Sequence, residues 1–225
     1  MNVRSRPLAL PRGVGRSRVP TASLGAKRAF DIGLSAVGLV VSSPLWLFFS
    51  LAIRIEDGGP VFYRQERSGL RGVVFDAFKF RSMIPDAEAR VGAVQSRAGD
   101  PRVTRVGRFL RATAMDELPQ LWNIFRGDMS FVGPRALRPG EIEAVSDGRV
   151  EMLEDVPGFA ERASVRPGLT GIAQIYAPRD VPRRLKFRYD RLYVRRRSFW
   201  LDIGLVLLSF WITLRGRWEV RGRKF

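Results

Sequence analysis

The sequence predicts a mixed α/β protein, mostly helical, that is attached to a membrane through its N-terminal part. Three observations lead to this prediction. Residues 29–53 are almost wholly apolar, as expected of a membrane segment. Residues 61–65 ("VFYRQ") and 73–80 ("VVFDAFKF") have strand composition and flank the turn "RSGLRG". Most later segments show apolar residues at helical spacing.

The composition limits the chemistry that is open to this chain. It has 225 residues and a formal charge of +17, from 39 Lys and Arg against 22 Asp and Glu. This predicts an anionic partner, which could be nucleic acid, a lipid surface or a phosphorylated substrate. The chain has no Cys and no His, which excludes disulfides, thiolate zinc sites and a histidine base. A metal would be held by oxygen ligands, with Mg²⁺ as the default.

The two ends of the chain carry surplus positive charge. Residues 1–25 combine Pro, Gly, Ser and Arg without a periodic apolar pattern, and no acid occurs before Asp31. We therefore expect a disordered basic arm there and a short basic tail at 217–225.

The apolar stretch is expected to form a helix–break–helix hairpin over residues 26–55. As one straight helix, residues 29–53 would extend about 38 Å, enough for a bilayer core of about 30 Å. Proline disrupts a helix, however, and Ser43-Pro44 lies near the middle. Basic residues also flank both ends, which favours both ends on the cytoplasmic side. A re-entrant hairpin satisfies both features, and a kinked single span is the alternative.

The remaining elements follow from periodicity. Residues 199–214 are apolar but contain Asp202, which indicates either a core helix or a helix in the membrane interface. The basic segment 183–197, within a predicted helix, would face a membrane or a nucleic acid. The expected helices are 85–95, 117–125, 139–153, 181–197 and 199–214, and 106–112 is a short basic helix or a turn.

The adjacent acids Asp116 and Glu117 allow two interpretations. Acidic residues favour helix N-termini because they complement the helix dipole, so the pair could be a helix start. It could instead be a nucleophile with a neighbouring acid–base or metal-binding carboxylate. Arginines around the pair favour the second interpretation, since they keep a carboxylate ionised and can bind phosphate. They are Arg102, Arg105, Arg108, Arg111, Arg126 and Arg135.

Three further segments could bind phosphate. Lys79 and Arg81 in "KFRSM" point the same way on a strand, which would make a phosphate clamp or a solvated face. The Gly/Pro-rich segments 125–135 and 165–174 could cradle phosphate with backbone N–H groups, or be ordinary turns.

Taken together, six sequence blocks resemble the monotopic phosphoglycosyl transferases, also called bacterial sugar transferases or undecaprenyl-phosphate sugar phosphotransferases, in their short form. The resemblance covers residues 26–216, and the DELPQLWN segment is its most distinctive part. The blocks are "KRAFDIGLSAVGLVVSSPLW", "GGPVFYRQERSG", "FDAFKFRSM", "DPRVTRVGRFLRATAMDELPQLWNIFRGDMSFVGPR", "RPGLTGIAQ" and "YDRLYVRRRSFWLDI".

The resemblance implies a re-entrant membrane helix and interfacial amphipathic helices that carry a small catalytic domain, residues 56–216, on the cytoplasmic face of the bacterial inner membrane. The implied reaction transfers a sugar-1-phosphate from a UDP-sugar to undecaprenyl phosphate and releases UMP. This is the first membrane step of polysaccharide or glycoconjugate assembly. Anionic membrane lipid is a further implied partner, nucleic acid is not, and a homodimer stays open. No motif indicates which sugar is moved.

The resemblance also implies roles for single residues. Asp116 matches the nucleophile, with Mg²⁺ beside it, and Glu117 matches its partner carboxylate. Phosphate binding falls to Lys79, Arg81, Arg111 and Arg135. The loop Gly133-Pro134-Arg135 lies at the nucleotide pocket. Two departures are Ala136, where the family usually has a second proline, and Ala114-Met115 before the acidic pair.

Two other classes of protein fit the sequence less well. A nucleic-acid-binding protein would use the charge of +17. In such a protein the apolar stretch would have no role, and the sequence contains no recognised DNA- or RNA-binding motif. A membrane scaffold with a basic surface leaves the acidic pair and the Gly/Pro loops unexplained.

Overall fold

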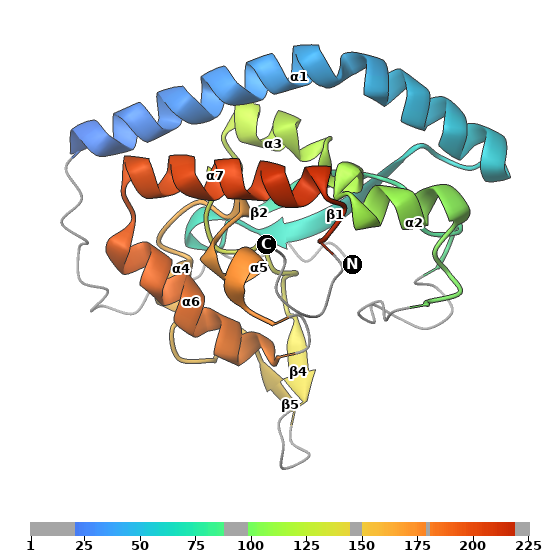
Figure 1. Cartoon of the computed structure of the whole chain (residues 1–225). Coiled ribbons are helices and arrows are strands. Elements are labelled where there is room, and N and C mark those ends of the chain that lie inside the picture. The colour runs from blue at the N-terminus through green and yellow to red at the C-terminus, as the bar shows by residue number, and fades with distance from the viewer. Residues whose placement is uncertain (1–20, 88–98, 145–149, 179–180, 219–225) are drawn as a thin grey trace.

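The computed structural model describes residues 21–87, 99–144, 150–178 and 181–218, and it shows helices arranged around three small sheets (Figure 1). The predicted mixed α/β fold is confirmed, although helices make up about half of the protein rather than most of it. The helices are α1 (Thr21–Asp57), α2 (Arg105–Ala112), α3 (Gln120–Arg126), α4 (Phe159–Arg162), α5 (Ile172–Tyr176), α6 (Arg183–Arg196) and α7 (Phe199–Leu214), with 3₁₀ turns η1 (Leu70–Gly72) and η2 (Met115–Glu117).

The apolar N-terminal segment forms one bent helix rather than two helices separated by a break. α1 continues through Pro44 and arches over the rest of the molecule (Figure 1). Pro44 cannot donate a hydrogen bond to the carbonyl of Val40, but the Ser43 hydroxyl donates to that carbonyl instead, at 2.8 Å. The freed acceptor is thus satisfied, so the helix bends without breaking.

By length and composition, α1 could cross a membrane from Gly25 onwards. It already begins at Thr21, inside the arm predicted for 1–25, while residues 1–20 lie outside the described part. The basic tail is described only as far as residue 218.

The first sheet agrees with the two strands that were predicted from composition on either side of the turn "RSGLRG". β1 (Phe62–Ser68) pairs antiparallel with β2 (Val74–Phe80). Two further pairs were not predicted. β3 (Ser130–Val132) lies parallel to β6 (Gly168–Thr170), and β4 (Ile142–Ala144) lies antiparallel to β5 (Val150–Met152).

The helix predicted for 139–153 is wrong, because that segment contains β4 and β5. The sequence held a contrary signal, because the dipeptide Asp-Gly at positions 147–148 is typical of hairpin turns and stands between β-branched residues. The predicted polar helix 85–95 lies mostly in residues 88–98, outside the described residues, and 85–87 form a turn.

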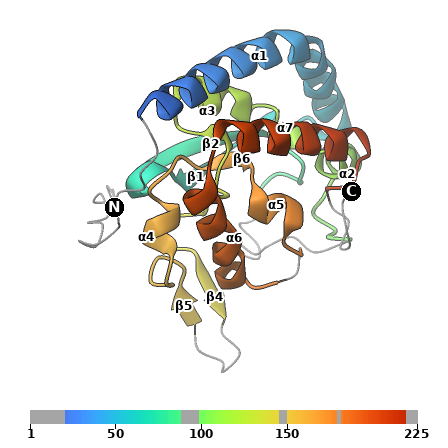
Figure 2. The same ribbon diagram turned by 60° about the vertical axis from the view of Figure 1, so that its left-hand side comes forward.

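The main core lies between strands β2 and β3 and helices α3, α5, α6 and α7. α1 crosses α3 closely, and a Cβ added to Gly38 would lie 3.2 Å from Cδ1 of Leu121. A second cluster joins the later part of α1 to β2 and α2 through Phe49, Phe80 and Leu110. Both ends of α1 are therefore packed against the same body (Figures 1 and 2).

Helices α1, α3 and α7 lie on one side of the molecule, and the β4–β5 hairpin lies on the other (Figures 1 and 2). α7 was predicted as a core or an interfacial helix. Leu205 and Ile212 are buried in the core, whereas Phe210 is exposed, and contact of the exposed side with a membrane stays a prediction. Large exposed apolar residues gather on these helices, as expected of a membrane-contacting surface. They are Val37, Val40, Val41, Leu47, Phe48, Leu51, Ile55, Trp122, Phe125, Trp200, Leu207, Phe210, Trp211 and Leu214.

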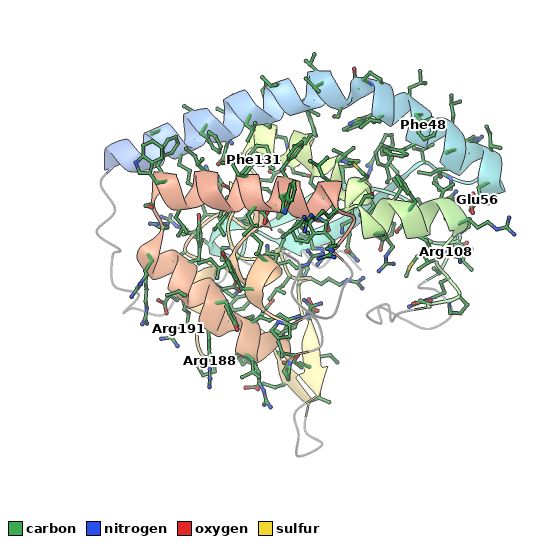
Figure 3. All side chains as sticks on the ribbon, in the orientation of Figure 1. Phe48, Glu56, Arg108, Phe131, Arg188 and Arg191 are labelled. Atoms are coloured by element: carbon green, nitrogen blue, oxygen red, sulfur yellow. The ribbon has the colours of Figure 1, made fainter. Side chains whose placement is uncertain are left out.

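The basic helix α6 was expected to face a membrane or a nucleic acid. Its Arg188 and Arg191 project from the side of the molecule away from α1 (Figure 3). These arginines therefore do not face the same way as the apolar helices.

Candidate active site

The acidic pair lies in the 3₁₀ turn η2 between α2 and α3. α2 ends at Ala112, and Ala114 then adopts a left-handed conformation with φ of 57°, which turns the chain sharply. The N-cap residue of α3 is Pro119. The pair thus does not cap a regular helix, and its side chains are presented from a tight connection.

Three segments meet at Glu117. Its Oε1 accepts hydrogen bonds from Lys79 Nζ at 2.5 Å and from Arg135 Nη2 at 3.1 Å. Lys79 lies near the end of β2, and Arg135 follows β3. The Glu117 and Lys79 side chains are only 15% and 16% exposed. The structure therefore brings together three of the residues that were predicted for the site.

The two carboxyl groups of the pair have different electrostatic surroundings. Burial would raise the pKa of Glu117, but the charges and hydrogen bonds of Lys79 and Arg135 outweigh it and lower that pKa to about 2. Burial raises the pKa of Asp116 to about 6, and the Glu117 charge adds to this, against the opposing charges of Lys79, Arg111 and Arg135. Arg111, on α2, thus acts electrostatically on Asp116, as expected of a residue close to the pair.

Glu117 is already held by two cations, whereas Asp116 has no hydrogen bond or ion pair to any residue in the described ranges. Both carboxylate oxygens of Asp116 are therefore open to a substrate or a metal. Within the described residues, no group of three potential protein ligands could hold a metal ion. Mg²⁺ commonly takes only one or two carboxylates and completes its shell with phosphate oxygens and water. Asp116 fits that pattern.

Arg81 was predicted to bind substrate phosphate, but it makes its ion pair elsewhere, with Asp57 at the end of α1. The side chain is buried and lies against Gly59, where an added Cβ would overlap its guanidinium. Arg81 therefore joins the end of α1 to the end of β2, and its contact with a substrate phosphate stays a prediction.

The two Gly/Pro-rich segments, predicted separately, support each other. Gly133 N donates to Thr170 O, and Gly168 N donates to Pro134 O, both at 2.9 Å. An added Cβ on Gly168 would lie 2.0 Å from Gly133 N, so only glycine permits this approach. The Gly133-Pro134-Arg135 loop is thereby fixed and presents Arg135 to Glu117.

Asn123 is a supporting residue that sequence reasoning did not single out. It is fully buried on α3. Its Oδ1 accepts from Phe78 N at 3.1 Å, and its Nδ2 donates to Asp76 O at 2.7 Å. Asn123 therefore ties the helix that follows the acidic pair to the strand that carries Lys79. Its position within the DELPQLWN block was the available signal.

The first turns of α1 hold both sides of the site. Arg28 donates to the carbonyls of Ile124 and Phe125, each at 2.7 Å, and so caps the C-terminus of α3. Asp31 Oδ1 accepts from Ser130 Oγ and Phe131 N, both at 3.1 Å, at the start of β3. In the sequence, Arg28 is only one of the basic residues that flank the apolar stretch.

Comparisons with known proteins agree on one family. Residues 22–216 match the family described as bacterial sugar transferase. The exopolysaccharide production protein ExoY of Rhizobium meliloti is 37% identical over 90% of this chain and 90% of its own length. An undecaprenyl-phosphate glucose phosphotransferase of Komagataeibacter xylinus is 40% identical over 81% of this chain. An undecaprenyl-phosphate galactose phosphotransferase of Salmonella typhimurium is 36% identical over 84%. The matches span only 35% and 40% of the last two relatives.

Proposed function

The chain belongs to the bacterial sugar transferase family, and we propose that it transfers a sugar-1-phosphate from a UDP-sugar to undecaprenyl phosphate. The products are undecaprenyl-diphosphate-sugar and UMP. The relatives from K. xylinus and S. typhimurium are named as undecaprenyl-phosphate phosphotransferases of glucose and galactose. The observation that carries the proposal is the different pairing of the two acids. Glu117 forms ion pairs with Lys79 and Arg135, so we assign the role of nucleophile to Asp116.

The reaction has two steps in this proposal. A carboxylate oxygen of Asp116 attacks the sugar-bearing phosphorus of the UDP-sugar, the bond from that phosphorus to the bridging oxygen breaks, and UMP leaves with the electron pair. An oxygen of undecaprenyl phosphate then attacks the same phosphorus and releases Asp116 as a carboxylate. Neither step requires proton removal from the nucleophile, so the absence of histidine is no obstacle. Aspartyl-phosphate enzymes use the same type of intermediate.

The residues around Asp116 supply position and charge, which are the main requirements of phosphoryl transfer. Lys79 and Arg135 fix Glu117 and keep it ionised. Arg135 is 44% exposed at its side chain and can also face a substrate phosphate. A bound Mg²⁺, with Asp116 as its protein ligand, would neutralise charge on the phosphate oxygens.

We also propose that α1 enters and leaves the membrane on one face, the cytoplasmic face of the bacterial inner membrane. Near its start, Lys27 pairs with Asp202 of α7 at 2.5 Å. At its end, Glu56 accepts from Arg105 N of α2 at 2.6 Å and lies beside α2 (Figure 3). A straight span would place its two ends on opposite sides of the bilayer. Contacts of both ends with one domain, together with the bend and the basic flanks, support the re-entrant arrangement.

UMP release without the lipid acceptor tests this function. Purified protein in detergent with Mg²⁺ is given a UDP-sugar that is radiolabelled in its sugar phosphate. We expect about one equivalent of UMP and covalent retention of the label, as for a covalent intermediate. A panel of UDP-sugars would identify the sugar. A protein that consumes no UDP-sugar, with or without undecaprenyl phosphate, would contradict the proposed activity.

A further inference from the structure

Arg67 lies beside the loop that presents Arg135. It is near the end of β1, and the next residue, Ser68, donates its N–H to Leu137 O at 2.8 Å. The Arg67 guanidinium itself donates from Nη1 to Ala136 O at 2.9 Å and from Nη2 to the side-chain oxygen of Gln65. β1 therefore runs along the segment that follows Arg135.

The charge of Arg67 has no counter-ion of its own among the described residues, because both hydrogen bonds of its guanidinium go to neutral oxygens. The nearby carboxylates are engaged by other cations: Glu117 by Lys79 and Arg135, and Glu141 by Arg183 at 2.7 Å. Burial, followed by the charges of Arg135 and Arg138, lowers the pKa of Arg67 to about 10. The free protein thus keeps a partly buried guanidinium next to other cations.

We propose that Arg67 binds the phosphate of the leaving nucleotide, together with Arg135. This inference rests on the proposed function and adds a binding residue to it. Arg135 contacts Glu117, the neighbour of Asp116. Arg67 contacts the carbonyl of Ala136, the residue after Arg135, and so lies further from Asp116 along this chain of contacts. A phosphate attached to Asp116 would therefore lie on the Arg135 side, and the second phosphate of the donor would lie toward Arg67.

The chemistry of the nucleotide matches this position. The phosphate of UMP gains negative charge when the bond to the sugar phosphate breaks, and a planar guanidinium can bind two of its oxygens. Such a phosphate would provide the counter-ion that Arg67 lacks. Stabilisation of the departing group would also favour the first step of the reaction.

A simpler role for Arg67 would be to fasten the loop through the Ala136 carbonyl, and variants can separate the two roles. Arg67→Gln retains an N–H donor for that carbonyl but removes the charge. Arg67→Lys retains the charge but loses the planar fork. The matched control is Arg64→Gln: Arg64 lies on the same strand, is exposed, and stacks on Phe78 at 5.6 Å.

The test is equilibrium binding of UMP to each purified protein, with the thermal unfolding midpoint measured in parallel. We expect Arg67→Gln to bind UMP about tenfold more weakly or worse, as for loss of a charged hydrogen bond, and Arg67→Lys to be intermediate. Arg64→Gln should bind UMP like the wild type. In turnover, Arg67→Gln should raise the KM for the UDP-sugar.

Wild-type affinity for UMP in folded Arg67→Gln would overturn the inference and leave the proposed function intact. If Arg67→Gln does not fold, wild-type affinity in Arg67→Lys would overturn it instead. A wild-type protein that neither binds UMP nor releases it from any UDP-sugar would refute the proposed function, and this inference with it.

Discussion

Lys27 and Asp202 are 175 residues apart in the sequence, yet Lys27 Nζ lies 2.5 Å from Asp202 Oδ2. The same carboxylate accepts a hydrogen bond from the Tyr193 hydroxyl at 2.9 Å, and Lys27 also donates to Val132 O at 3.2 Å. This buried contact explains the single acid in the apolar helix α7. It joins the start of α1 to α7 and to β3, directly before the Gly133 loop.

The first prediction concerns this ion pair. Lys27→Met should lower the free energy of unfolding by about 3 kcal/mol, because it leaves the buried Asp202 carboxylate without a cation. The double variant Lys27→Met/Asp202→Leu should recover part of that loss, since it removes the charge as well. Thermal or chemical unfolding in detergent measures both. Equal stability of Lys27→Met and the wild type would show that the pair contributes little.

The second prediction concerns the nucleophile. Asp116→Asn keeps the size of the side chain and should fold normally, but it should lose lipid-independent UMP release and turnover by several orders of magnitude. Asn caps helices as well as Asp does, so a role at a helix start would survive this change. Glu117→Gln should also be severely impaired, because Lys79 and Arg135 then lose their common carboxylate. An active Asp116→Asn enzyme would refute the assignment.

The elements that the sequence predicted correctly depend on local patterns. The strands near 61–65 and 73–80 follow from their composition and the turn between them, and the helices near 181–197 and 199–214 follow from helical periodicity. The break that was predicted at Ser43-Pro44 is absent, because proline alone does not determine whether a helix bends or breaks. That depended on the Ser43 hydrogen bond to the Val40 carbonyl.

The contacts that complete the site join segments that are distant in sequence, and these could not be predicted. Arg81 illustrates the limit: its strand position resembles that of Lys79, but only the fold shows that Asp57 is its partner. The parallel pairing of β3 with β6 and the Asn123 link to β2 likewise have no local signature. The acidic pair itself was found because the arginines around it are close in sequence.

The third prediction concerns pH. In the proposed mechanism, Asp116 attacks phosphorus as an ionised carboxylate. Its pKa is raised to about 6, so the rate of UMP release should fall as the pH decreases through that value. The Lys79 charge lowers this pKa. Lys79→Met should therefore shift the acid limb of the pH profile, where the rate of UMP release falls, to higher pH. It should also reduce the maximal rate. Single-turnover UMP release between about pH 5 and pH 8 measures the limb. Arg64→Met is the control, and its pH profile should match that of the wild type. A Lys79→Met profile that falls at the same pH as the wild type would contradict the prediction.

The fourth prediction concerns the metal. The chain has no His or Cys, so an essential ion would be bound by carboxylate and phosphate oxygens, which suit Mg²⁺ or Mn²⁺. EDTA should abolish UMP release, and added Mg²⁺ should restore it. The unfolding midpoint should hardly change, because no carboxylate cluster in the described residues depends on the ion. Full activity in excess chelator would remove the metal from the mechanism.

The last prediction concerns the topology of α1. Because the chain has no cysteine, single cysteines at Arg18, before the helix, and at the exposed Glu66, after it, can be labelled without background. If both ends of α1 lie with the catalytic domain, a membrane-impermeant thiol reagent should label both positions in inverted membrane vesicles and neither in intact spheroplasts. Labelling of Arg18→Cys from the outside would instead indicate a single span. That span would have to break the Lys27–Asp202 ion pair, or the Asp57–Arg81 ion pair at the other end of the helix, because a straight helix cannot hold both of its ends against one domain while it crosses the bilayer.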